Sequence, residues 1–490
     1  MPQAFRGEHY RMYKQTLLFL MIHAIDTLYP ALPIEVHQSV AHATYCRIVD
    51  PLFRTEEVLS NIEAHMQHLI DSDMPLSVLT VPPEEAYQIY MQNGETDKAE
   101  SLACCARTSF QFFDTGYKKH ALYAKVYPTA GCVREFKLTM FQDGFMLRYP
   151  NEAAGNTIPK LTASRKILQT LVDYRRWHSV LDLSDVFDLN AAIREGKAKE
   201  IVNISESLHE KMISDLADTI TADRKLRVVL ISGPSSSGKT SFANRLRIHL
   251  RVNGINPVVL SMDDYYRGRT QAPLDENGNY DYECPEALDY ELFNNHLEQI
   301  IRGETVNTPL FDFNSGNRMT ATKPVSLGAN QILIVEGIHA LNEIFSSKVV
   351  EENKFKIYCT PLTVMSFDTY NPLSPTDLRL LRRTIRDTKF RKSPAENTLS
   401  MWKSVRRGEK KHIFPFEHTA DHIFNSSLSY EFCVIKEQAE KELKTIPESS
   451  PHYETAKQLL EFLSYFCPIP EDLVPPTSIL REFIGGSTVV

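Results

Sequence analysis

Apolar residues recur every three or four positions in several stretches of the first third of the chain. Between residues 13 and 29 this spacing predicts a buried helix, which Pro30 ends. A second helix is expected from Thr55, a favourable N-cap residue, to about Ile70, and a third after Pro83. The first part of the chain is therefore rich in amphipathic helices.

The pattern changes to an alternation of apolar and polar residues between positions 134 and 149. Alternation with a period of two is typical of strands that bury one face, and the pair Asp143–Gly144 in the middle favours a tight turn. This pattern predicts a β-hairpin. Residues 1–195 are accordingly expected to form an α+β domain, followed by a connecting helix over 196–224.

Short runs rich in β-branched residues occur from about residue 225 onward, separated by helical or loop segments. Such runs are typical of a parallel sheet with helices on both faces. We therefore predict an α/β domain over 225–445, and a C-terminal helix with a proline-rich tail over 446–490 as an appendage. The predicted strands are RVVLISG at 227–233, NPVVLSM at 256–262, QILIVEG at 331–337 and KFKIYCT at 354–360.

The length of 490 residues exceeds the roughly 250 to 300 residues that one hydrophobic core supports, so at least two domains are expected. A hydrophobic fraction of 42% and a charged fraction of 24% are typical of a soluble globular protein. A net charge of -8 argues against a protein that coats nucleic acid. The eight cysteines form no CxxC pair, and the most apolar segment, 17–25, is too short to span a bilayer. We expect a cytoplasmic protein with reduced thiols and no membrane segment.

Residues Gly233 to Thr240 match the phosphate-loop pattern G-x-x-x-x-G-K-[ST], directly after a predicted strand and directly before a helical pattern. Glycines let backbone N–H groups wrap a phosphate, and the following helix points the positive end of its dipole at the anion. Lys239 is expected to bridge the β- and γ-phosphates of ATP, and Thr240 to ligate Mg²⁺. The residues predicted to bind ATP are Gly233, Ser235, Ser236, Ser237, Gly238, Lys239, Thr240 and Ser241.

Two carboxylates follow strands of the same predicted sheet. Glu336 ends the run ILIV at the edge where α/β sheets bind ligands, and we expect it to serve Mg²⁺; an ordinary strand-terminal acid is the alternative. Asp263 follows the run VVLSM, and a hydroxyl acceptor needs such a carboxylate to take its proton and to hold Mg²⁺. We assign Asp263 as general base and metal ligand, against the alternative of a turn or N-cap aspartate.

Residues 225–430 resemble the uridine kinase and phosphoribulokinase family. The matching segments, in the order of that family, are GPSSSGKTS, LSMDDYYR, EALD, ILIVEGIHAL and DLRLLRRTIRD. The resemblance implies an α/β P-loop NTPase kinase fold, with Asp263 as the general base beside Tyr266 and with Glu336 at the magnesium. It also implies an arginine-rich lid over the phosphates, here residues 377–387.

The lid segment carries arginines that recur at three- and four-residue spacing, which places their guanidinium groups on one side of a helix. Such a cluster can stabilise a transferring phosphoryl group, and a solvated helix with internal Asp–Arg pairs is the alternative. The residues predicted to act in catalysis are Lys239, Asp263, Arg382 and Arg386. The residues predicted to contact the acceptor are Tyr266, Glu283, Phe311 and Arg379.

Two segments depart from the pattern of uridine kinases on the acceptor side. The family's F-D-H-P segment, whose aspartate holds ribose hydroxyls, is YECP at 282–285. Its Y-D-F-x-x-H segment, which reads the pyrimidine, is FDFNSG at 311–316, so both base-reading side chains are missing. A site that hydrogen-bonds a base discriminates strongly through those groups. Uridine or cytidine is therefore the family default for the acceptor, and another small alcohol remains open.

Residues 8–150 resemble the additional domain that threonyl-tRNA synthetases use for editing, through the segments LLFLMIHAIDTLYP and YPTAGCVREFKL. The two editing histidines and the later Cys–His pair of the synthetases align with or near Gln15, Phe19, Asp114 and Lys118. The resemblance therefore implies a binding or positioning domain without hydrolytic activity. The small domain that often precedes this arrangement is missing, which indicates a short form or a truncated chain.

The combined expectation is an ATP-dependent kinase that moves the γ-phosphoryl group, with Mg²⁺, to a hydroxyl of a nucleoside-like small molecule. The rival hypothesis is an ATP-regulated protein that binds RNA or an aminoacyl group and turns over no nucleoside. A weak RNA contact through the N-terminal domain and a homo-oligomer are the other predictions about partners.

Overall fold

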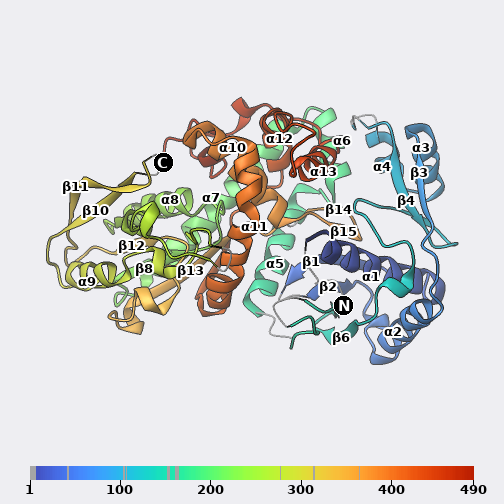
Figure 1. Ribbon diagram of the computed structural model, residues 1–490, viewed down its shortest axis with the longest axis horizontal. Coiled ribbons are helices and arrows are strands. Elements are labelled where there is room, and N and C mark those ends of the chain that lie inside the picture. The colour runs from blue at the N-terminus through green and yellow to red at the C-terminus, as the bar shows by residue number, and fades with distance from the viewer. Residues whose placement is uncertain are drawn as a thin grey trace.

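The chain forms two halves with a group of helices between them (Figure 1). The computed structural model describes residues 7–40, 43–102, 105, 107–151, 155–160, 165–275, 278–312, 315–363 and 365–489. In Figure 1 the N-terminal half lies on the right, in blue and cyan, and the sheet of the C-terminal half lies on the left, in green and yellow. Helices from the last third of the chain, in orange and red, lie between them.

Two helices and a four-stranded antiparallel sheet form the centre of the N-terminal half. The elements are α1 Gly7–Leu28, α2 Glu56–Asp71, β1 Ile34–Val40, β2 Ala43–Ile48, β6 Lys137–Phe141 and β7 Gly144–Arg148. The strand order is β1-β2-β7-β6, and one buried cluster joins the sheet to both helices through residues such as Leu17, Ile62 and Phe145. Thr55 caps α2 by accepting a hydrogen bond from the N–H of Val58 at 3.2 Å. The first two predicted helices are thus confirmed.

The hairpin predicted around Asp143–Gly144 is present, but its turn lies one residue earlier. Strands β6 and β7 pair Phe141 with Gly144, so Gln142 and Asp143 form the turn, and Gln142 has a φ of 51°. Gly144 is needed for a different reason, because a Cβ there would lie 2.0 Å from the carbonyl oxygen of Cys46. The glycine therefore permits close approach of the neighbouring strand and does not make the turn.

A second antiparallel sheet with two short helices completes this half. Its elements are β3 Val78–Val81, β4 Phe110–Asp114, β5 Lys119–Ala121, α3 Pro83–Gln92 and α4 Thr96–Ser101. The strand order is β3-β4-β5, and Figure 1 shows α3 and α4 beside β3 and β4. The helix predicted after Pro83 is α3, and Pro82 takes its N-cap position.

Three helices lead from the N-terminal to the C-terminal half: α5 Arg165–His178, α6 Val186–Arg194 and α7 Ala198–Ala222. The predicted connecting helix over 196–224 is confirmed as α7. It buries an apolar stripe that includes Val202, Ile213 and Leu216. Among the described residues, no helix is both long and apolar enough to cross a bilayer.

The C-terminal half is built on a five-stranded parallel sheet, as the sequence predicts. Its strands are β8 Val228–Ser232, β9 Val258–Ser261, β12 Leu333–Glu336, β13 Lys354–Thr360 and β16 His422–Asn425. The strand order is β16-β13-β8-β12-β9, so the strand before the phosphate loop lies in the middle. The four predicted strands are confirmed, and β16 is an additional one.

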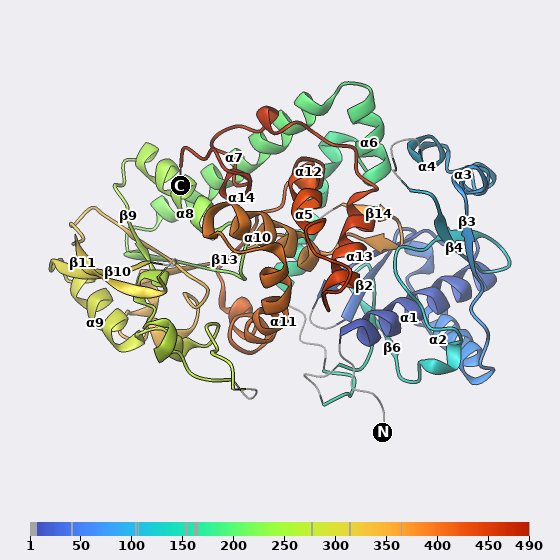
Figure 2. The ribbon, with the colours of Figure 1, turned by 45° about the horizontal axis from the view of Figure 1, so that its top comes forward.

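Helices cover both faces of this sheet because β8 buries residues on both sides. Val229 and Ile231 belong to a cluster with α7 and α8, whereas Val228 and Leu230 belong to a cluster with α9. Figure 2 shows α7 and α8 on one side of the sheet and α9 on the other. The bounds are α8 Lys239–Val252 and α9 Tyr290–Ile301.

The C-terminal half also contains an extended hairpin and the helices α10 to α13. The hairpin consists of β10 Val306–Asp312 and β11 Asn317–Val325, and the sequence analysis does not predict it. The helices are α10 Pro375–Arg391, α11 Ala395–His412, α12 Glu431–Leu443 and α13 Tyr453–Leu463. The arginine-rich segment over 377–387 lies within α10, so its predicted helical conformation is confirmed.

A short hairpin fastens the C-terminal half to the N-terminal half. It consists of β14 Ser366–Asp368 and β15 Asn371–Pro372, between the sheet and α10. The ring of Phe367 stacks on that of Tyr123 with centroids 4.3 Å apart, and the carbonyl of Thr369 accepts a hydrogen bond from the N–H of Val36 at 2.7 Å. The largest buried apolar cluster therefore continues across the predicted boundary between the two domains.

The last residues of the chain return to the phosphate loop. The segment ends in α14 Arg481–Ile484. Ile479, Leu480 and Phe483 are fully buried and belong to the main core. The interpretation of this tail as an appendage is therefore wrong, because its apolar residues are part of the packed interior.

Candidate active site

The phosphate loop connects β8 to α8 at the carboxyl edge of the sheet. Two of its residues have left-handed backbone conformations, Ser236 with a φ of 59° and Gly238 with a φ of 85°. A Cβ at Gly233 would lie 1.9 Å from the carbonyl oxygen of Cys359, so only glycine fits there. Backbone that passes between right- and left-handed conformations exposes N–H groups in a concave arrangement that binds anions.

Lys239 is the first residue of α8 and folds back over the loop. Its Nζ donates to the carbonyl oxygen of Pro234 at 3.1 Å, and the residue is 9% exposed. Its positive charge acts on the carboxylates of both Asp263 and Glu336. Lys239 therefore contacts the phosphate loop and at the same time contributes positive charge near the two carboxylates.

Glu336 ends β12 and is opposite Ser261, the last residue of β9. Its Oε1 accepts a hydrogen bond from the Ser261 hydroxyl at 2.7 Å, and its Oε2 accepts one from the Thr240 hydroxyl at 3.5 Å. Burial, followed by the negative charge of Asp263, raises the pKa of Glu336 to about 7. The strand register thus brings two predicted metal ligands, Thr240 and Glu336, into contact.

Asp263 lies in a short 3-10 helix directly after β9. The hydroxyl of Ser261 caps this helix by accepting a hydrogen bond from the Asp263 N–H at 3.3 Å. Burial raises the pKa of the Asp263 carboxyl group, while the positive charges of Lys239, Arg391 and Arg386 oppose the rise. A raised pKa makes this carboxylate a stronger proton acceptor than an ordinary aspartate.

The side chains of Thr240, Asp263 and Glu336 form a donor set that suits Mg²⁺, which prefers oxygen ligands and keeps several waters. The charge of Asp263 raises the pKa of Glu336, so a divalent cation would relieve a repulsion between them. No group of three or more His, Cys, Asp or Glu side chains in the described part of the chain is arranged to hold a metal by itself. The residues therefore fit a cation that is shared with a bound phosphate.

Two predicted acceptor contacts, Tyr266 and Phe311, form an aromatic wall beside Asp263. The Tyr266 hydroxyl donates to the carbonyl oxygen of Tyr282 at 3.1 Å, and its ring centroid lies 5.6 Å from that of Phe311. The N–H of Phe311 donates to the carboxylate of Asp264 at 3.1 Å. Asp264 therefore holds the wall in place, which distinguishes its role from that of Asp263.

Glu283, a third predicted acceptor contact, lies half-buried against α11. A Cβ at Gly408 would lie 2.2 Å from the Cβ of Glu283, so the two segments touch closely. The Oε2 atom of Glu283 is buried and has no hydrogen-bond partner among the described residues. Burial raises the pKa of Glu283 to about 7, against the lowering effect of Arg383. This carboxyl group is thus available to a hydroxyl donor of a bound molecule.

Two lid arginines are fully buried and hold the phosphate loop from behind. Arg379 and Arg382 are 2% and 0% exposed, and they form bidentate pairs with Glu409 and Glu431, respectively. Arg382 also donates to the carbonyl oxygen of Ser236 at 3.3 Å. This placement differs from the predicted contacts of Arg379 with the acceptor and of Arg382 with the transferring group. Their charges are already neutralised inside the protein, so in this structure they shape the loop.

The other two lid arginines, Arg383 and Arg386, lie nearer to the carboxylates. Arg383 donates to the hydroxyl of Ser235 at 2.8 Å, and Arg386 donates to Asp387 at 3.0 Å. The charge of Arg386 also acts on Asp263. The helix thus contains the internal Asp–Arg pairs of the alternative interpretation, but it is buried and not solvated. Of the two arginines predicted to act in catalysis, Arg386 is the one whose charge acts on Asp263.

Glu409 on α11 is a site residue that the sequence analysis does not identify. Its fully buried carboxylate accepts hydrogen bonds from the Ser235 N–H at 3.1 Å, from Arg379 at 2.8 Å and from Arg406 at 2.7 Å. It therefore ties α10 and α11 to the phosphate loop. The surrounding sequence, RRGEKKH, has the composition of an exposed basic stretch, so no local signal reveals the buried carboxylate.

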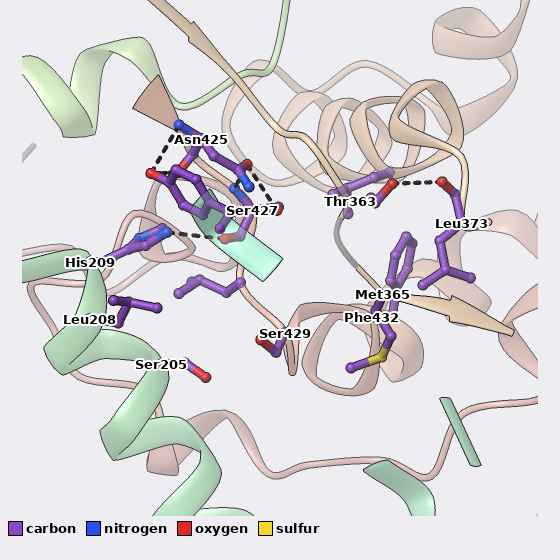
Figure 3. A pocket seen from close by; sticks show the side chains of 13 residues that line it. Ser205, Leu208, His209, Thr363, Met365, Leu373, Asn425, Ser427, Ser429 and Phe432 are labelled. Carbon is purple, nitrogen blue, oxygen red and sulfur yellow. Dashed lines mark hydrogen bonds between the residues drawn. The ribbon is translucent and has the colours of Figure 1, made fainter. Parts of the chain in front are cut away.

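A small cavity lies where α7, α10 and the loop before α12 meet (Figure 3). Its volume of about 40 Å³ accommodates a few water molecules but no nucleoside. His209 Nε2 lies 3.0 Å from the carbonyl oxygen of Ser427, whereas the hydroxyl of Ser205 and the Nδ1 of His209 have no partner among the described residues. Bound water satisfies such groups in protein interiors. This cavity is therefore too small to be the nucleoside site that the sequence analysis predicts.

Comparisons with known proteins match the region of the chain that contains the phosphate loop and the carboxylates. Residues 228–430 match the model of the phosphoribulokinase / uridine kinase family. The chain is 32% identical over 195 residues to a uridine kinase from Bacillus pumilus, covering 40% of this chain and 83% of that protein. It is 30% identical over 197 residues to a uridine kinase from Aliivibrio fischeri, covering 40% of this chain and 83% of that protein.

A solved structure of a possible uridine kinase from Bacillus stearothermophilus aligns with 44% of this chain and 97% of that chain, at 21% identity and a TM-score of 0.31. The region matched by the family model contains the phosphate loop, Asp263, Glu336 and the lid helix. Through this region the chain belongs to the phosphoribulokinase and uridine kinase family.

Proposed function

We propose that this protein is a kinase that moves the γ-phosphoryl group of ATP to a hydroxyl of a small acceptor, with a uridine- or cytidine-like nucleoside as the first candidate. The observation that supports this most directly is Asp263. Burial raises the pKa of this carboxylate, and the positive charges of Lys239 and Arg386 oppose the rise. Lys239 belongs to the phosphate loop. A protein that only senses ATP has no need of such a base.

In the proposed reaction, Asp263 accepts the proton of the acceptor hydroxyl as its oxygen attacks the γ-phosphorus. The new oxygen–phosphorus bond forms while the bond to the β–γ bridging oxygen breaks, and ADP leaves with that electron pair. Lys239 and Arg386 stabilise the negative charge that the phosphoryl group carries during transfer. Mg²⁺, when bound, neutralises phosphate charge, and Thr240, Glu336 and Asp263 are the residues that would hold it.

The acceptor is proposed to lie between the aromatic wall and Glu283. Tyr266 and Phe311 offer a surface for a flat or apolar part of the molecule. Glu283 offers a buried carboxyl oxygen without a hydrogen-bond partner among the described residues, which suits a hydroxyl or a pair of hydroxyls. Both features fit a nucleoside, and a different small alcohol with a bulky apolar part is the alternative acceptor.

The N-terminal half is proposed to bind or position a partner without catalysing hydrolysis. At the positions that align with editing histidines, Phe19 is buried with its ring 4.6 Å from that of Phe113, and Gln15 donates to Asn371 at 3.4 Å. Both side chains are used for packing within the protein. They leave no pair of bases or metal ligands at these two positions.

The test is ATP consumption by purified protein with Mg²⁺ against a panel of nucleosides and sugar alcohols. We expect turnover with one acceptor, and a loss of about 10²- to 10⁴-fold in kcat in Asp263→Asn. Lys239→Ala should also lose activity, and Asp97→Asn, an exposed position on α4, is the matched control. Tight ATP binding without any acceptor-dependent turnover would contradict the proposal. In that case RNA binding with a steep salt dependence would support the rival hypothesis.

A further inference from the structure

The C-terminal segment, residues 478–486, lies directly against the start of α8. Figure 2 shows the C-terminus beside α8, and α14 next to α10. Ile479 fills the space at Gly238, where an added Cβ would lie 2.6 Å from the Cγ2 of Ile479. The segment therefore packs on the same glycine that gives the phosphate loop its shape.

The lid helix holds this segment in place. The guanidinium group of Arg382 lies 4.8 Å from the ring centroid of Phe483, and Lys389 donates a hydrogen bond to the carbonyl oxygen of Ile484. Phe483 and Ile484 are themselves buried. The contact with α8 is thus part of a built interface and not the chance position of a free end.

Glu482 uses this position to place a carboxylate on the phosphate loop helix. Its Oε2 accepts a hydrogen bond from the N–H of Ser241 at 3.1 Å. Ser241 is the third residue of α8, so its N–H is one of the donors that the helix itself leaves unpaired. These N–H groups and the positive end of the helix dipole are what a phosphate oxygen would use.

The negative charge of Glu482 also extends into the site, because it contributes to the raised pKa of Glu336 after burial and Asp263. A triphosphate adds further negative charge at the same helix terminus. Two anions cannot share the Ser241 N–H, and close repulsion between them is costly where water is scarce.

We propose that Glu482 is an internal competitor of the nucleotide: its carboxylate occupies the Ser241 N–H, and a phosphate group of ATP binds by replacing it. The C-terminal segment thereby sets the affinity for ATP. This inference rests on the proposed function, because it assumes that the phosphate loop binds ATP. Glu482 is half-exposed, so its side chain can leave Ser241 for solvent, and the C-terminal segment then loses one of the contacts that hold it against α8.

The first test is calorimetric titration of the full chain with MgATP. Glu482→Gln keeps the shape of the side chain and removes its charge, so we expect it to bind MgATP roughly 5- to 30-fold more tightly than the wild type. Asp472→Asn is the matched control, since Asp472 is exposed in the same tail, and its affinity should stay within about twofold. Unchanged or weaker binding by Glu482→Gln would overturn the inference.

A second measurement separates displacement from a general effect of charge, and it needs no variant. Hydrogen exchange of the wild-type protein is followed with and without saturating MgATP. If ATP displaces Glu482, amides of residues 478–489 should exchange faster with ATP while the phosphate loop exchanges more slowly. Tighter binding by Glu482→Gln with an unchanged tail would show a charge effect alone and overturn the inference. Failure of the wild type to bind MgATP would overturn the proposed function as well.

Discussion

The N-terminal and C-terminal halves differ in which side chains lie at the positions where the sequence resemblances lead us to look for catalytic residues. In the N-terminal half these positions hold packing residues, as Phe19 shows with its contact to Phe113. In the C-terminal half Lys239, Asp263 and Glu336 lie close enough for their charges to act on one another. The charged side chains that interact at one edge of a sheet are thus found in the C-terminal half, and a fold by itself does not determine which side chains it carries.

The two halves also differ in how buried polar groups are used. The C-terminal half encloses two bidentate ion pairs, Arg379 with Glu409 and Arg382 with Glu431, behind the phosphate loop. Buried pairs of this kind contribute little net stability, but removal of one partner leaves an uncompensated charge. The buried ion pairs of the C-terminal half therefore fix the conformation of the phosphate loop. An apolar core could stabilise the domain equally well, but it would not offer hydrogen bonds to the loop.

The largest effect is expected from equivalent substitutions in the two halves. Asp263→Asn should lower kcat by about 10²- to 10⁴-fold because the acceptor loses its base. Asp114→Asn, at a position near the aligned editing residues, should leave kcat within about twofold because Asp114 only accepts a hydrogen bond from a turn N–H. Turnover assays of both variants with the identified acceptor measure the contrast. Equal losses in both variants would break the comparison.

A smaller effect, on stability, is expected from Glu409→Gln. The substitution leaves the Arg379 charge buried without compensation, so the free energy of unfolding should fall by about 3 to 5 kcal/mol. Urea unfolding measures the change, with Glu454→Gln, an exposed position on α13, as the control. A loss no greater than that of the control would show that the buried framework is not needed.

The next effect concerns pH and the junction between the halves, where His209 lies on α7. Burial, followed by the charge of Arg245, lowers the pKa of His209 to about 3. The unfolded chain takes up this proton below about pH 6.5 and the folded chain does not, so stability is present above pH 6.5 and falls as the pH decreases toward 3.

Between pH 7 and 5.5 the contribution of His209 should amount to a loss of about 1 kcal/mol. The measurement compares urea unfolding of the wild type with that of His209→Gln at both pH values. The variant should show a smaller pH dependence, whereas His68→Gln, at an exposed site on α2, should not differ from the wild type in this respect. An identical pH dependence in His209→Gln would contradict the assignment.

The smallest effect is expected at the hairpin that joins the halves. Phe367→Leu removes the stacking on Tyr123 and should cost about 1 kcal/mol of unfolding free energy. Because the main core continues across the boundary, the wild type and the variant should each unfold in a single transition by calorimetry. Two separate transitions in the wild type would show that the halves are energetically independent.

Much of the parallel sheet and the phosphate loop could be predicted because their signals are local. The motif from Gly233 to Thr240 joins a strand to a helix within a few residues, and the carboxylates of Asp263 and Glu336 follow predicted strands directly. Strand ends of a parallel sheet meet at one edge, so local signals were enough to bring these groups together.

The rest of the site could not be predicted because it depends on contacts between distant segments. The spacing of the lid arginines indicated that they cluster, but not that Arg379 and Arg382 would be paired and buried. Their partners, Glu409 and Glu431, lie in stretches whose sequence shows no sign of burial. The role of Glu482 was likewise hidden, because its contact with Ser241 joins residues 241 positions apart.

The hairpin of β14 and β15 has a mechanical consequence for the lid. After β13 the chain leaves the sheet and contacts the N-terminal half at Phe367 and Thr369. Helix α10 begins shortly afterwards, with Ser374 as its N-cap. The amino end of α10 is thus held in place by the N-terminal half. Because the arginines of α10 are bonded to the phosphate loop, a displacement of the N-terminal half would reach that loop through α10.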